Sequence, residues 1–171
     1  MEVPDLLREY AKTLLTALNV PTPGEWPGEP FVPADQPEAI ARILIPVLHS
    51  HLEEPLEARI VYLFREKLSK KAAVASKAGA KLVYLGEVDF TIEFDWTQWR
   101  TLTAEQRIAL VDHELCHCAW DGEHEKWAMR EHDVEEFGEI VQRWGLWQPR
   151  LKDFGVYVKP HVQTELFRQA S

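Results

Sequence analysis

His113, Glu114 and His117 stand in the order His-Glu-Leu-Cys-His, and their types and spacing could bind and use a metal ion. Two histidines four residues apart lie on one face of a helix, where both imidazoles can ligate a single Zn²⁺ at about 2.0–2.1 Å. Glu114 directly follows His113, so it is rotated off the ligand axis and can act as a general base without taking a coordination position. The motif predicts a zinc-dependent hydrolase with His113 and His117 as ligands and Glu114 as the base.

A hydrolytic zinc site needs a third protein ligand if one position is to stay open for water. The residues after His117 offer these candidates: His124, Glu131, His132, Asp133, Glu135 and Glu136. His124 is one residue too far from His117 for the HExxHxxGxxH pattern of metzincins, and we expect it at the surface. His132 is expected near the middle of a following helix, and an antiparallel helix pair can bring such a residue over the HExxH face. His132 is therefore the predicted third ligand.

Other residues near the motif have less direct roles. Asp133, Glu135 or Glu136 could orient a ligand imidazole as hydrogen-bond acceptors. A glutamate as third ligand, Glu135 or Glu136, is the alternative. Cys116 and Cys118 are given no metal role, since a small buried side chain off the histidine face is the expected use of Cys116.

The flanking sequence predicts the elements that position the motif. Thr103 and Gln106 form a capping box, so the HExxH helix is expected to begin near residue 103 and to run to about Trp120. Asp121-Gly122 is a turn signal, and the next helix is expected from about Glu125 to Trp144, closed by Gly145. Upstream, we expect an amphipathic helix over 4–19, a proline-rich connector, a helix over about 37–53, and strands over 58–64 and 81–96.

These elements predict an α+β fold in which a small β-sheet packs on the HExxH helix and on a second ligand-bearing helix, with helices at the N-terminus. At 171 residues the chain is expected to form a single domain. Its expected parts are N-terminal helices and connector (1–55), a catalytic core (56–147) and a C-terminal tail (148–171).

Composition narrows the functional classes. No apolar run approaches the roughly 20 residues that span a bilayer, and no leader pattern is visible, so a cytoplasmic protein without membrane association is expected. The formal charge of −9 disfavours simple binding to nucleic acid. The segment from Arg65 to Lys81, however, carries six basic residues against one acidic, so a nucleic-acid contact there is possible but not favoured.

A longer stretch, roughly residues 85–147, carries a combination more specific than the HExxH motif alone: Asp89-Phe90-Thr91-Ile92, Trp99, Gln106-Arg107, Ala109 to His117, Arg130 to Asp133, Glu136-Phe137 and Arg143-Trp144-Gly145. This combination resembles the putative phage metallopeptidase family and, more distantly, the SprT-like (Spartan-type) zincin domains. In the latter, a histidine on the next helix, followed by an aromatic residue, completes the metal site, and His132 and Phe137 match that arrangement.

The resemblance implies a phage- or prophage-encoded zinc metallopeptidase that hydrolyses peptide bonds of a protein substrate, in the host cytosol. It also implies that the substrate lies extended along an edge strand, for which Asp89 to Asp95 is the expected segment. Tyr157, His124 and His161 are the candidates to stabilise the oxyanion. Two alternatives stay open: a zinc-containing, non-catalytic protein that blocks a host protein, and a DNA-associated SprT-like protease. The sequence does not define the oligomeric state.

Overall fold

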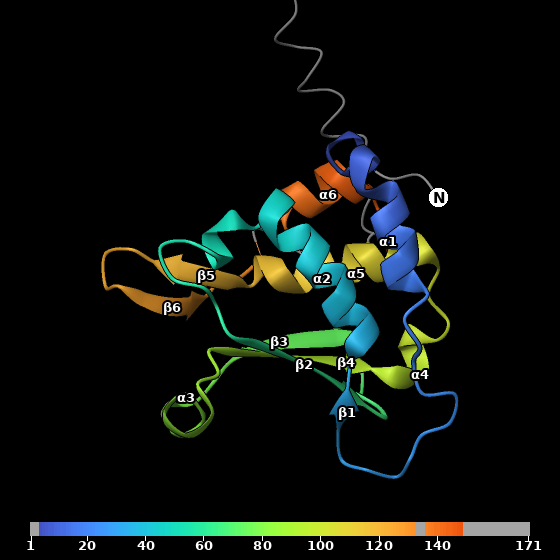
Figure 1. Cartoon of the computed structure of the whole chain (residues 1–171), viewed down its shortest axis with the longest axis horizontal. Helices are drawn as coiled ribbons and strands as arrows, with labels where there is room; N and C mark the ends of the chain where they lie inside the picture. The colour runs from blue at the N-terminus through green and yellow to red at the C-terminus, as the bar shows by residue number, and fades with distance from the viewer. Residues whose placement is uncertain (1–3, 133–135, 149–171) are drawn as a thin grey trace, which may run out of the picture. The chain divides into compact units, whose positions relative to one another are not determined.

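The computed structural model describes residues 4–132 and 136–148. The chain divides into two compact units, Met1–Glu131 and His132–Ser171. The first unit holds a four-stranded sheet, a two-stranded hairpin and helices (Figure 1). The described part of the second unit holds one helix, α6 (Gly138–Trp144), which ends at Gly145 with a positive φ of 64°. The predicted α+β class is confirmed, and so is the end of the last helix at Gly145.

The four-stranded sheet has the order β1-β2-β4-β3. Its strands are β1 (Val32–Pro33), β2 (Ile60–Arg65), β3 (Ala73–Lys77) and β4 (Phe90–Asp95). β2 and β4 run parallel, whereas β1 and β3 are antiparallel to their neighbours. Alternate residues on β2 and β4 are buried: Tyr62, Phe64, Phe90, Ile92 and Phe94. Since alternate side chains of a strand point to opposite faces, one face of the sheet carries the core.

Two helices of the first unit, α2 and α5, pack on the sheet, and a third, α1, packs against α2 (Figure 1). They are α1 (Ala11–Leu18), which follows a 3₁₀ turn over Asp5–Tyr10, α2 (Asp35–Leu48), which precedes a 3₁₀ turn over Ser50–Leu52, and α5 (Ala104–Cys116). Pro46 lies inside α2. The short helix α4 (Trp96–Trp99) follows β4 and places Trp99 edge-on against Phe64 and Phe94, with ring centroids 5.9 and 5.2 Å away. The N-terminal helices agree with the sequence prediction.

Gln36 joins four of these elements through one buried amide. Its Nε2 donates to the carbonyls of Leu18 and Val20, and its Oε1 accepts from Trp99 Nε1 and Arg107 Nη1. All of these bonds are 2.7–3.0 Å long. A buried polar group is stabilising only when its hydrogen bonds are made, so this amide fixes the positions of α1, α2, α4 and α5 relative to one another.

The HExxH helix begins as predicted but ends earlier. Thr103 Oγ1 accepts from the backbone of Gln106, whose side chain accepts from the Thr103 backbone, which is the predicted capping box. The helix ends at Cys116 instead of continuing to about Trp120. The chain then forms a hairpin of β5 (Cys118–Asp121) and β6 (Lys126–Met129).

The prediction of one helix from about Glu125 to Trp144 is wrong. Its first part is β6, and α6 begins only at Gly138. Trp120 pairs with Trp127 across the hairpin, with ring centroids 4.9 Å apart, and such a cross-strand aromatic pair stabilises strands over helix. The Asp121 carboxylate accepts from the backbone of Glu123 and His124, so the predicted turn at Asp121-Gly122 is present and closes the hairpin.

The predicted strand over 81–96 is correct only in its second half. Residues 80–86 form helix α3 (Ala80–Gly86), which Glu87 ends in a left-handed conformation with φ 51°, and β4 follows. The edge strand β3 arises from a run of small residues over which the sequence predicts no strand. Within residues 4–132 and 136–148, no helix is long and apolar enough to cross a membrane.

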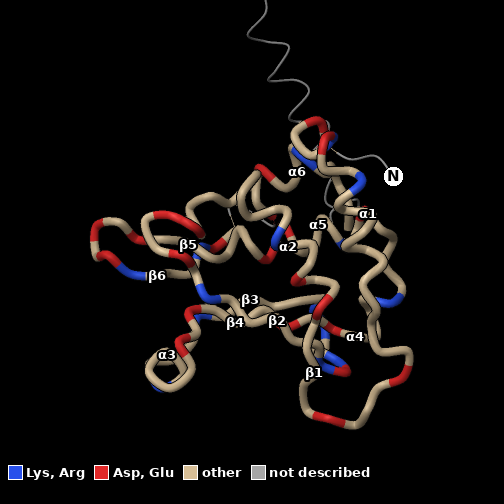
Figure 2. Tube along the Cα trace, in the orientation of Figure 1, with Lys and Arg blue, Asp and Glu red and all other residues tan. Residues whose placement is uncertain are grey.

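The basic segment 65–81 is divided between the two ends of the sheet. Its first lysines follow β2 in the loop that lies near β1 and α4, whereas Lys81 lies on α3 at the opposite end (Figure 2). Arg65 pairs with Glu93 at 3.3 Å and lies over the Phe31 ring. The segment therefore does not gather its charge on one surface.

Candidate metal centre

Helix α5 carries His113 in its last turn, and His117 follows as its C-cap residue, one turn further on. Their ring centroids are 5.1 Å apart and their planes meet at 75°. His113 is 7% exposed and His117 is half-buried. Two imidazoles at this spacing on one helical face form a donor set that suits Zn²⁺, so these two residues fit the metal that the sequence predicts.

The imidazole of His117 is oriented by the end of the hairpin. Its Nδ1 lies 2.8 Å from the carbonyl oxygen of Arg130, and the Arg130 backbone N–H donates to the His117 carbonyl, also at 2.8 Å. A carbonyl oxygen only accepts, so Nδ1 carries the proton and Nε2 presents its lone pair. A ligand imidazole is commonly fixed in this way, through a hydrogen bond at the nitrogen that does not bind the metal.

Glu114 is held against the edge of the sheet. Its Oε2 accepts from the backbone N–H of Ala75 on β3 at 2.7 Å, and the residue is 3% exposed. Hydrogen bonds join Ala78 N to Asp89 O and Asp95 N to Ala72 O, so the even-numbered residues of this region bond to β4. In an antiparallel pair the residues between them direct their backbone groups away from the partner strand. The N–H of Ala75 therefore points outward from the sheet, toward Glu114.

The expectation that Asp89 to Asp95 forms an edge strand is wrong. β4 lies inside the sheet, with β2 on one side and β3 on the other. The edge strand beside Glu114 is β3. In the sequence, β3 is a short run in which Val74 and Ser76 separate the alanines, and this run has too little apolar side-chain area to distinguish a strand from a helix.

A second polar cluster lies behind the histidine pair. His49, at the end of α2, places Nε2 2.7 Å from Oδ1 of the fully buried Asp112, and His51 Nε2 lies 2.8 Å from the carbonyl of Cys118. The ligand atoms of His49, Asp112 and Cys116 lie within 4.8 Å of one another. The 2.7 Å separation is a hydrogen bond, because two ligands of a tetrahedral zinc lie roughly 3.3 Å apart given bonds of about 2.0 Å. The cluster therefore fixes α5 to the end of α2, and no sequence pattern pointed to it.

Both cysteines are buried thiols, as expected for Cys116. Burial, together with the negative charge of Glu114, raises the pKa of the Cys118 thiol far above its ordinary value.

The remaining predicted residues fall into three groups. His124 is exposed and its Nδ1 lies 2.8 Å from Asp121 Oδ2, so its assignment to the surface is confirmed. His132 belongs to no helix, contrary to prediction; it is the first residue of the second unit, where its ring lies edge-on to Phe137 at 4.9 Å. Glu136 accepts from the backbone of Phe137 and from Trp147 Nε1. Asp133, Glu135, Tyr157 and His161 lie outside the described residues.

An HExxH helix capped beside a small mixed sheet is the arrangement of a zincin-like α+β metallopeptidase domain. The chain belongs to the putative phage metallopeptidase family, whose sequence model matches residues 29–155. Membership of this family indicates a metallopeptidase and implies a bound metal. No curated protein and no solved structure matches the chain.

Proposed function

We propose that the protein is a zinc-dependent metallopeptidase of phage origin that cleaves a protein substrate, with His113, His117 and His132 as zinc ligands and Glu114 as the general base. One observation carries the proposal: the carboxylate of Glu114 is bonded to the outward-facing N–H of an edge strand, one residue away from a ligand histidine. An edge strand can align an extended peptide by backbone hydrogen bonds, so the peptide would be held beside the base.

Chain connectivity supports His132 as the third ligand without the helix pair that the sequence suggested. The Arg130 backbone is bonded to His117 through both its N–H and its carbonyl. His132 follows two residues later, and two residues span at most about 7 Å. The histidine is therefore held near His117 by the covalent chain itself.

The protein's own groups would act in a simple order. Outward-facing backbone groups of Ala73 and Lys77 would bond the peptide along β3, with the scissile carbonyl beside Glu114. When bound, zinc supplies a Lewis acid that polarises this carbonyl and lowers the pKa of water. Glu114 would take the proton from the attacking water and pass it to the leaving amine nitrogen. The fixed tautomer of His117 keeps Nε2 deprotonated throughout.

The test combines metal content with cleavage. Purified protein is expected to contain one zinc per chain, and Glu114→Gln is expected to retain it while losing at least about 100-fold in peptide cleavage, the scale of a general base. Cleavage that is unchanged in Glu114→Gln would refute the assignment of the base. A variant that keeps its full biological effect without cleavage would instead support a zinc-containing protein that blocks its partner.

The assignment of His132 as the third ligand can be tested against a matched control, a nearby histidine that is not a proposed ligand. His132→Ala is expected to lose zinc, measured by metal analysis after dialysis. His124→Ala is expected to retain it, because His124 is exposed and paired with Asp121. Full zinc occupancy in His132→Ala would exclude His132 and direct attention to Glu131 or Glu136.

A further inference from the structure

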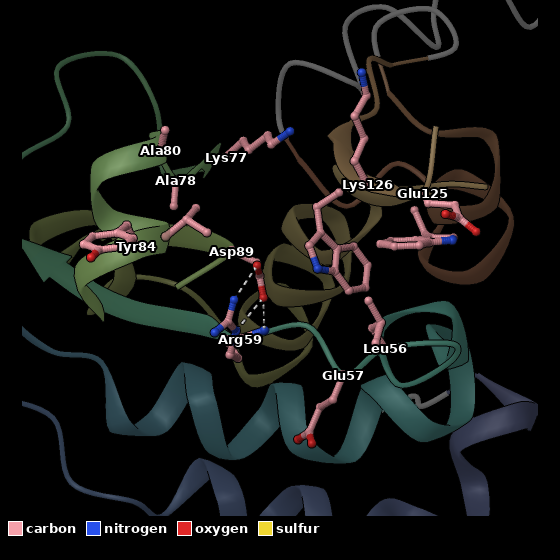
Figure 3. Close-up of a pocket in the computed structure, with 13 residues that line it drawn as sticks. Leu56, Glu57, Arg59, Lys77, Ala78, Ala80, Tyr84, Asp89, Glu125 and Lys126 are labelled. Atoms are coloured by element: carbon pink, nitrogen blue, oxygen red, sulfur yellow. Dashed lines mark hydrogen bonds and ion pairs between the residues drawn. The ribbon is translucent and has the colours of Figure 1, made fainter. Parts of the chain in front are cut away.

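A large pocket opens in the first unit, away from the histidine pair. Its volume is about 750 Å³, within the roughly 300–1,000 Å³ of small-molecule pockets. One wall comes from α3 and the residues before it, including Ala78, Ala80 and Tyr84, and the opposite wall comes from the hairpin and the loop before β2 (Figure 3). The hairpin contributes Trp120 and Trp127.

The pocket is suited to an apolar group and not to an ion. Its one inward charge pair, Arg59 and Asp89, is mutually satisfied: Arg59 Nε donates to Asp89 Oδ2 at 2.9 Å and Nη2 donates to Oδ1 at 3.0 Å (Figure 3). Burial raises the pKa of Asp89, but the hydrogen bonds from Arg59 outweigh it and hold that pKa below its ordinary value. The other charged lining residues are balanced in sign: Lys77 and Lys126 against Glu57 and Glu125.

The mouth of the pocket exposes apolar side chains to an unusual degree. Every residue of α3 is at least partly exposed, Tyr84 is 87% exposed, and Leu56 on the opposite wall is 56% exposed. Exposed apolar residues that gather around a concavity are typical of a binding site. The occupant that they favour is itself large and apolar.

The pocket is continuous with β3, the edge strand whose Ala75 N–H is bonded to Glu114. Lys77 is the last residue of β3, Ala78 follows it, and both line the pocket. They lie two and three residues after Ala75, whose N–H binds Glu114. At about 3.3 Å per residue, the pocket wall lies roughly 7–10 Å along the strand from the base. A peptide extended along β3 therefore reaches the pocket within two or three residues of the bond beside Glu114.

We propose that this pocket selects substrates that carry a large apolar, preferably aromatic, side chain two or three residues from the scissile bond. The inference rests on the proposed peptidase function. A peptide that pairs antiparallel with β3 runs from the pocket toward Glu114, so the selected residue lies on the N-terminal side of the cleaved bond. Trp120, Trp127 and Tyr84 supply the aromatic surfaces that contact it.

The test measures binding separately from cleavage. The probes are blocked, dye-labelled alanine octapeptides in which each position in turn carries Phe, Leu, Asp or Lys. They are titrated by fluorescence anisotropy into the zinc-loaded full chain carrying Glu114→Gln, which cannot consume them. Burial of one aromatic side chain is expected to tighten binding about tenfold or more at one position, relative to alanine or aspartate.

Two variants on α3 form a matched pair. Ala80→Trp places a ring in the pocket, whereas Lys81→Trp places the same ring on the next residue, which does not line it. Both positions are exposed, so neither change is expected to disturb the core. Ala80→Trp is expected to abolish most of the tenfold preference for Phe, and Lys81→Trp is expected to keep it. The absence of any Phe preference, or a preference untouched by Ala80→Trp, would overturn the proposal.

Cleavage by the chain with Glu114 intact then separates the two proposals. Products mapped by mass spectrometry are expected to place Phe two or three residues N-terminal to the cut. Cleavage without any apolar preference would refute the pocket assignment and leave the peptidase standing. Binding with the Phe preference but without cleavage would refute the peptidase and leave a peptide-binding pocket.

Discussion

The two edges of the four-stranded sheet are built in opposite ways. β1 is two residues long and one of them is Pro33, which has no N–H to offer. β3 is five residues long, directs the backbone of its odd-numbered residues outward, and contacts Glu114 through Ala75. Short edge strands and proline are common protections against unwanted strand pairing. One edge is therefore closed to an incoming strand, and the open edge is the one beside the HExxH helix.

Under the proposed function, this difference selects β3 as the edge that pairs with the substrate peptide. An exposed edge strand carries a risk of aggregation, which proline and the short length of β1 reduce at one edge of the sheet but not at β3. Variants that change the backbone groups of the two edges, or that remove the bonds holding β3 in place, test whether the two edges differ.

The largest effect is expected from proline at an even-numbered position of β3. Ser76→Pro removes a donor that faces β4 and leaves its partner carbonyl without a hydrogen bond, which should destabilise the fold by about 3 kcal/mol. Chemical denaturation of the variant and the parent measures the difference in the free energy of unfolding. A negligible loss would mean that β3 does not depend on its pairing with β4.

A smaller loss of stability is expected from Asp95→Ala. The carboxylate of Asp95 is buried and accepts from the backbones of Leu68 and Gln98 and from Thr97 Oγ1, so it ties the loop before β3 to the end of β4. Loss of these bonds should cost about 2 kcal/mol. Glu93→Ala on the same strand removes only an exposed pair with Arg65 and should cost less than about 1 kcal/mol.

The difference in the free energy of unfolding between Asp95→Ala and the parent should depend on pH. Burial raises the pKa of Asp95, but the hydrogen bonds from Thr97, Leu68 and Gln98 outweigh it, so the pKa lies below the ordinary value of 3.8. A lowered pKa in the folded state stabilises the fold above the ordinary pKa, and this contribution disappears as the pH falls through the lowered value. The difference between variant and parent should be constant near neutral pH and should shrink below about pH 4. A difference that grows on acidification would contradict this sign.

The smallest effect is expected from variants that change the outward-facing backbone N–H groups at the two edges of the sheet. Lys77→Pro removes an outward-facing N–H of β3 and should lower kcat/KM for peptide cleavage about tenfold, the value of one lost hydrogen bond of about 1.4 kcal/mol. Lys77→Ala keeps the N–H and should retain most of the activity, and Pro33→Ala at the closed edge should leave cleavage unchanged. Equal losses in Lys77→Pro and Pro33→Ala would remove the distinction between the edges.

The parts of the structure that can be predicted from the sequence are those that depend on local chemistry. The capping box of Thr103 and Gln106, the turn at Asp121-Gly122 and the HExxH spacing each depend on residues a few positions apart, and all three were predicted. The hairpin was missed because Trp127 and Trp120 stabilise it across the strands, and a periodicity along the chain does not register such a contact.

The parts of the site that the sequence does not predict also depend on contacts between residues far apart in the chain. Ala75 has no chemistry of its own, and it is important only because its backbone faces Glu114, 39 residues away. The bond between His49 and Asp112 spans 63 residues. Long-range backbone and side-chain contacts follow from the packing of the sheet and helices, so no spacing rule could have given them.

Under the proposed function, the two hydrogen bonds between Arg130 and His117 link metal affinity to the folding of the hairpin. Because β6 leads directly into this backbone pair, any opening of the hairpin releases the imidazole from its orienting bond. By thermodynamic linkage, an ion that binds the oriented imidazole must stabilise the closed hairpin by the same free energy. Zinc would then protect the amides of β5 and β6 from hydrogen exchange, although neither strand contributes a ligand.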